Sequence, residues 1–139
     1  MQACLPKKDA AVAAADDWRA LNRANWDERV PIHLGAKSYD LGPLRAGRGQ
    51  LHAIEEAELG RVDGLRVLHL QCHFGRDTLT LAQRGADVVG LDFSVHAIDA
   101  ARELANELGL QGRARFVAAA ATGSWITTEE AIALCSRFA

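Results

Sequence analysis

The sequence lacks several features that would by themselves assign a function class. Its three cysteines, Cys4, Cys72 and Cys135, are far apart and form no C-x-x-C pair, which argues against a disulfide framework or zinc knuckle and fits a reducing cytoplasm. A formal net charge of −2 gives no sign of a nucleic-acid or anionic-membrane partner. No apolar run approaches the roughly 18 residues of a membrane-spanning helix.

What is present fits one globular domain. The 139 residues are 49% hydrophobic and 24% charged, enough for a modest core. We expect four segments: a flexible lead-in (1–16), a helical cap region (17–64), a βαβαβ unit (65–118) and an atypical tail with a short helix (119–139).

The cap region is predicted to hold two helices. The first covers residues 17–30 and stops at Pro31, after which glycines and prolines predict an irregular stretch up to residue 49. The second covers residues 50–59 and ends at Gly60, with Leu51, Ile54 and Ala57 facing inward.

From Leu65 the hydrophobic pattern changes to short apolar runs that alternate with helical periods. Residues 65–70 resemble a strand buried on both faces, and residues 87–91 and 114–118 are further strands. Between them lie one helix over residues 76–84, ended by Gly85, and another capped by Ser94 and ended by Gly109. This order predicts an α/β fold with a Rossmann-like, doubly wound parallel sheet.

Ligands of such sheets bind beyond the carboxyl ends of the strands. Asp92 ends the second strand, 21 residues after Gln71 in the first turn, near the offset of an acid that binds a ribose diol. We therefore expect Asp92 to bind ribose.

The first turn lacks glycines that a dinucleotide site needs. Gln71 and His73 stand where the first two glycines of G-x-G-x-x-G would be, and Gly75 alone remains. Side chains there would crowd a pyrophosphate, whereas S-adenosylmethionine has none. The turn thus favours a methyl donor over a nicotinamide cofactor, and an oxidoreductase is the alternative.

The stretch V-L-H-L-Q-C-H-F-G (67–75), followed by D-T-L (77–79) and V-G-L-D-F-S (89–94), resembles a branch of the class I S-adenosylmethionine-dependent methyltransferases. The resemblance implies the N-terminal half of that fold, preceded by two helices that cap the cofactor. It implies that Gln71, His73 and Gly75 surround the methionine part, that Asp92 binds the ribose and that Phe93 lies against the adenine. His33 and Tyr39 are candidates to line the cap.

Neither a metal site nor a catalytic residue is predicted. His69 and Cys72 should point to opposite sides if both lie on the strand, and no fourth ligand joins them and His73. No activating partner can be assigned to Cys72.

The chain departs from the family pattern after the third strand. An acid expected near Ala119 or Ala120 is replaced by alanines, and Thr127 and Glu130 form a capping box farther on. Measured against the resemblance, we expect this chain to lack strands four to seven and the region that holds the methyl acceptor. We expect the chain to be either a truncated or frameshifted fragment or a short cofactor-binding or interaction module that a partner completes. Because one sheet edge would be exposed, we expect the chain alone to be marginally stable or to self-associate.

Overall fold

The computed structural model describes residues 8–119. Three strands, β1 (Arg66–Leu70), β2 (Asp87–Asp92) and β3 (Ala114–Ala118), form one parallel sheet in the order β1-β2-β3. Leu70 pairs with Leu91, and Asp92 pairs with Ala118, so the strands end at nearly the same level. The predicted βαβαβ unit is confirmed.

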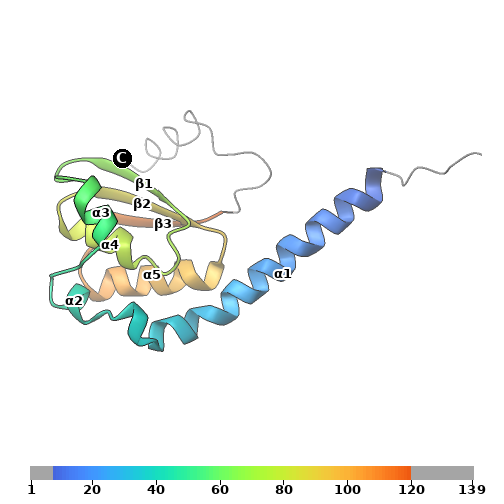
Figure 1. Cartoon of the computed structure of the whole chain (residues 1–139), viewed down its shortest axis with the longest axis horizontal. Coiled ribbons are helices and arrows are strands. Elements are labelled where there is room, and N and C mark those ends of the chain that lie inside the picture. The colour runs from blue at the N-terminus through green and yellow to red at the C-terminus, as the bar shows by residue number, and fades with distance from the viewer. Residues whose placement is uncertain (1–7, 120–139) are drawn as a thin grey trace, which may run out of the picture.

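Two helices connect the strands and cover one side of the sheet. Helices α4 (Arg76–Gln83) and α5 (Val95–Glu107) lie on the same side, below the strands in Figure 1. The predicted N-cap is confirmed, because the Ser94 hydroxyl accepts a hydrogen bond of 3.0 Å from the Ala97 amide. The core lies between helices and sheet, where several apolar side chains have almost no exposed surface: Phe74, Leu79, Ile98 and Ala101.

Strand β1 is less buried than its sequence predicts. It is an edge strand of the described sheet, and its residues are exposed at both ends and half-buried in between. The prediction of burial on both faces is therefore wrong for the described residues, since burial of a strand depends on neighbours that its own sequence does not contain.

The N-terminal helix α1 (Lys8–Gly35) is longer than predicted at both ends. It begins inside the segment expected to be a flexible lead-in, where alanines favour a helix. The prediction that Pro31 ends the helix is wrong. A proline removes one backbone donor, and here only one further turn follows it. Figure 1 shows the amino-terminal part of α1 extending away from the sheet, and its last turns returning to the body.

Three short helices connect α1 to the sheet: η1 (Lys37–Tyr39), α2 (Gly42–Arg45) and α3 (Ala53–Glu58). Pro43 lies in the first turn of α2, where a proline starts a helix rather than interrupting it. In α3 the predicted inward face is only partly correct. Leu51 is buried, but it precedes the helix, whereas Ile54 is 68% exposed and Ala57 is also exposed. No helix in the described part of the chain is long and apolar enough to span a membrane.

Candidate cofactor site

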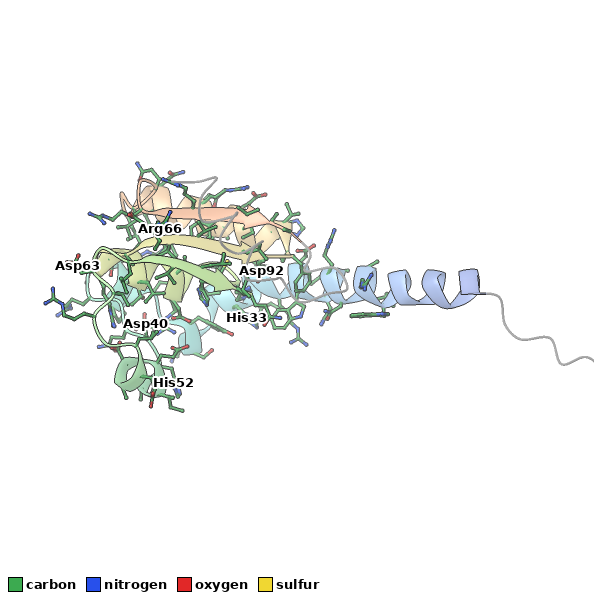
Figure 2. The ribbon with its side chains drawn as sticks, turned by 90° about the horizontal axis from the view of Figure 1, so that it is seen from above. His33, Asp40, His52, Asp63, Arg66 and Asp92 are labelled. Atoms are coloured by element: carbon green, nitrogen blue, oxygen red, sulfur yellow. The ribbon has the colours of Figure 1, made fainter. Side chains whose placement is uncertain are left out.

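The candidate site lies at the carboxyl ends of β1 and β2. Figure 2 shows Asp92 and His33 together at this end of the sheet, where the last turns of α1 join the body, with Arg66 and Asp63 toward the opposite end. The predicted residues meet here because parallel strands bring their carboxyl ends to one edge.

The turn after β1 has left-handed backbone of the kind that favours glycine, although two of the three residues that adopt it carry side chains. Gln71 and His73 have φ angles of 55° and 51°, and Gly75 has 79°. Left-handed backbone costs a residue with a side chain about 1 to 2 kcal/mol. The turn therefore has a backbone conformation that glycine would adopt without strain, but two of its three left-handed residues, Gln71 and His73, carry side chains.

Gly75 is explained by packing against the core. A Cβ atom there would lie 2.6 Å from Cε1 of Phe116 and 3.1 Å from Cβ of Ala101. These contacts come from β3 and α5, so Gly75 lets the start of α4 approach the sheet closely. The atoms that exclude a side chain at Gly75 belong to the protein's own core. Gln71, in the same turn, is exposed.

The Asp92 carboxylate is buried and held by two backbone amides. Its Oδ2 accepts a hydrogen bond of 2.8 Å from the His73 amide, and its Oδ1 accepts one of 2.9 Å from the Ser94 amide. A carboxylate has about four acceptor positions, so each oxygen retains one that no other donor among the described residues takes. The two hydroxyls of a ribose diol are donors for such positions, so the acceptor positions of the Asp92 carboxylate fit a ribose diol. Phe93, next along the chain, is half-buried.

A cluster of aromatic rings covers the His73 side of the turn. Nδ1 of His33 lies 2.9 Å from Nε2 of His73, and the Tyr39 ring stacks on the His33 ring at a centroid distance of 4.8 Å. Trp26 approaches His73 edge-on at 5.8 Å, and Phe74 lies beside it at 4.6 Å. The structure thus brings both proposed cap residues, His33 and Tyr39, onto the turn.

Burial and the neighbouring His33 lower the pKa of His73, against a smaller opposing effect of Asp92. The ring of His73 is therefore uncharged at neutral pH, which allows one of its nitrogens to accept a hydrogen bond.

The prediction that His69 and Cys72 point to opposite sides applied only if both lay on the strand, and Cys72 lies beyond it. Cys72 follows the end of β1, and both side chains lie beside Thr78, with His69 Nδ1 2.8 Å from its hydroxyl. Burial raises the pKa of the Cys72 thiol to about 12, so this thiol is not a nucleophile. Among residues 18–119, whose side chains the structure describes, no three His, Cys, Asp or Glu side chains are grouped as metal ligands.

Sequence reasoning missed two residues that reach the site from α1, Trp26 and Asp27. Trp26 lies seven residues before His33, or two helical turns, so both are on one face of α1. That spacing was the available signal. At the end of β3 the structure places Ala119 where an acid was expected, and Ala120 and the Thr127–Glu130 capping box lie outside the described residues.

Comparison with known proteins agrees with this geometry. Residues 67–138, 72 of the 139 in the chain, match the family described as methyltransferase domain. The chain is 39% identical over 61 residues to a magnesium-protoporphyrin O-methyltransferase of Rhodobacter capsulatus, covering 43% of the chain and 27% of that protein. It is 36% identical over 87 residues to a ubiquinone biosynthesis O-methyltransferase of Leptothrix cholodnii, covering 60% of the chain and 32% of that protein.

The matched parts therefore amount to about a third or less of each curated relative. The family match includes both turns of the site, from β1 through Asp92, and it extends over the third strand. It gives no support to the alternative of a nicotinamide-dependent oxidoreductase. The chain belongs to the methyltransferase domain family of the class I S-adenosylmethionine-dependent methyltransferases.

Proposed function

We propose that the chain binds S-adenosylmethionine at the carboxyl ends of β1 and β2 and supplies the methyl-donor half of a methyltransferase. The observation that carries this proposal is the Asp92 carboxylate, which is buried, held by two amides and left with acceptor capacity for a ribose diol. A buried carboxylate fixed in this way is arranged to recognise hydroxyl donors.

The other residues of the site are proposed around this anchor. Gln71, His73 and Gly75 surround the methionine part, and Phe93 lies against the adenine. The cofactor supplies an activated methyl group on its sulfonium. The protein's part is to hold that group in a fixed position so that a nucleophile can approach in line. The catalytic group on the acceptor side stays unassigned.

For the whole protein we propose an oxygen atom as methyl acceptor and a reducing, cytoplasmic setting. The first rests on the names of the two relatives, both O-methyltransferases, and the second on the scattered cysteines. We also propose that the chain by itself self-associates through β1, because Leu65 just before the strand and Leu70 at its end are 52% and 44% exposed. Sedimentation velocity over a concentration range tests this, and a monomer at all concentrations would exclude it.

Titration calorimetry with S-adenosylhomocysteine tests the cofactor site. Asp92→Ala should weaken binding at least about tenfold, since the lost hydrogen bonds involve a charged group. Asp87→Ala is the matched control, because Asp87 is an exposed aspartate at the opposite end of the same strand, with a 3.7 Å ion pair to Arg113. Binding that survives Asp92→Ala undiminished would remove Asp92 from the site, and equal losses in both variants would indicate a general loss of structure.

A further inference from the structure

Asp27 of α1 is connected to the candidate ribose-binding acid through Ser94. The Ser94 hydroxyl donates to Oδ1 of Asp27, while it accepts from the Ala97 amide at the start of α5. The Ser94 amide in turn donates to Oδ1 of Asp92. Ser94 is only 1% exposed, and its amide and hydroxyl are both engaged, so it has little freedom to shift without disturbing its partners.

A second connection from α1 reaches the other oxygen of the same carboxylate. The His73 amide donates to Oδ2 of Asp92, and the His73 ring lies 2.9 Å from the ring nitrogen of His33. Each amide that holds Asp92 therefore belongs to a residue whose side chain is bonded to α1. The two anchors, Asp27 and His33, are six residues apart on the same helix.

The surroundings of Asp27 indicate a specific contact rather than a chance surface pair. Its side chain is 18% exposed, and His96 Nδ1 lies 3.4 Å from the same Oδ1 that receives the Ser94 hydroxyl. The carboxylate also lies at the amino end of α5, where the helix dipole favours a negative charge. The neighbouring acid on α1, Glu28, is exposed.

We propose that Asp27 is a positioning residue for the cofactor, which acts by holding Ser94 and, through its amide, the Asp92 carboxylate. This inference rests on the proposed function. Docking of α1 and binding of the ribose are then coupled: a docked α1 presents Asp92 with both oxygens oriented, and a ribose on Asp92 favours the docked helix. His33 contributes in the same way through His73.

The coupling is measured with two ligands, S-adenosylhomocysteine and its analogue whose ribose lacks both hydroxyls, by titration calorimetry on the full chain. Asp27→Ala should weaken S-adenosylhomocysteine about fivefold to tenfold and leave the affinity for the analogue within twofold. Asp27→Asn keeps an acceptor for the Ser94 hydroxyl and should restore most of the affinity. Glu28→Ala, one residue along α1, is the control and should change neither ligand.

A merely structural role would have a different signature. If Asp27→Ala weakens both ligands equally, or neither, Asp27 does not act through the ribose contact and the inference is overturned. A wild-type chain that binds neither ligand would overturn the proposed function, and the inference with it. Hydrogen exchange at the Ser94 amide gives a readout without ligand: it should be faster in Asp27→Ala than in Glu28→Ala, and equal rates would count against the connection.

Discussion

The two turns that form the candidate site are built in opposite ways. The turn after β1 has left-handed backbone at Gln71, His73 and Gly75, and its shape is a property of the main chain. The turn after β2 has its acid and its helix cap, Asp92 and Ser94, each fixed by hydrogen bonds. The first turn therefore tolerates unusual side chains but depends on backbone conformation, whereas the second depends on the chemical identity of its side chains.

This difference explains how the turn after β1 can lack two glycines and still have left-handed backbone at their positions. The strain at two positions is balanced elsewhere, by the packing of Phe74 into the core and by the contacts of the His73 ring with α1. The second turn has no such compensation, so we expect its polar groups to be individually necessary.

The largest expected effect is at Gly75. Gly75→Ala should lower the free energy of unfolding by about 3 kcal/mol or more, because left-handed backbone and a 2.6 Å approach to Phe116 add together. Gly109→Ala is the control, since Gly109 has a φ of 68° and nothing within 4 Å of its Cβ position, so about 1 kcal/mol is expected. Urea unfolding of both variants separates packing from backbone strain, and equal losses would contradict the close approach.

In the second turn, Ser94→Ala should lower the free energy of unfolding by about 1 to 2 kcal/mol, because it removes the cap of α5 and the hydrogen bond to Asp27. Val95→Ala, the next residue, is 47% exposed and should cost less than about 0.5 kcal/mol. Thermal unfolding of the two variants gives the comparison. A Ser94→Ala protein as stable as Val95→Ala would show that this turn does not depend on its side chains.

Much of the sheet region was predictable because its signals are local. The cap at Ser94 and the ends of the two crossover helices depend on residues within a few positions, and the structure confirms them. The placement of Asp92 at the strand end followed from the same local pattern. The predictions that failed depended on contacts with residues elsewhere in the chain. Ile54 was expected inward from helical spacing, but no partner covers that face of α3 in the described residues.

The cluster of aromatic rings around His73 also depends on contacts between distant parts of the sequence. His33 and His73 are 40 residues apart, and no periodicity within α1 identifies the turn that its last residues will meet. The family resemblance supplied His33 and Tyr39 as candidates, although it did not supply Trp26 or Asp27. Pairings between distant segments depend on how α1 packs on α5, which a local pattern does not encode.

The first turn should also be the acid-sensitive one, because burial lowers the pKa of His73 below its usual 6.5. As the pH falls, the His73 side chain therefore takes up a proton in the unfolded chain before it does so in the folded one. The contribution of the neutral ring to the free energy of unfolding is complete above pH 6.5 and is lost as the pH decreases toward the lowered pKa of the folded state. The pKa of His69 is lowered in the same direction, also by burial. Urea unfolding at pH 7.5 and 5.5 should show a smaller loss in His73→Gln than in wild type. His52→Asn, which removes an exposed histidine but keeps a cap residue, is the control variant.

The smallest expected effect tests the backbone strain directly. Gln71 is exposed and has a φ of 55°, so Gln71→Gly should be more stable than Gln71→Ala by up to about 1 kcal/mol, because only glycine adopts this conformation without cost. A normal position in a turn would give the opposite order, since glycine loses more entropy on folding. If Gln71→Gly also keeps its affinity for S-adenosylhomocysteine, the first turn acts through its backbone course. A loss of affinity with unchanged stability would instead give the Gln71 side chain a direct part in binding, and the two turns would then work in the same way.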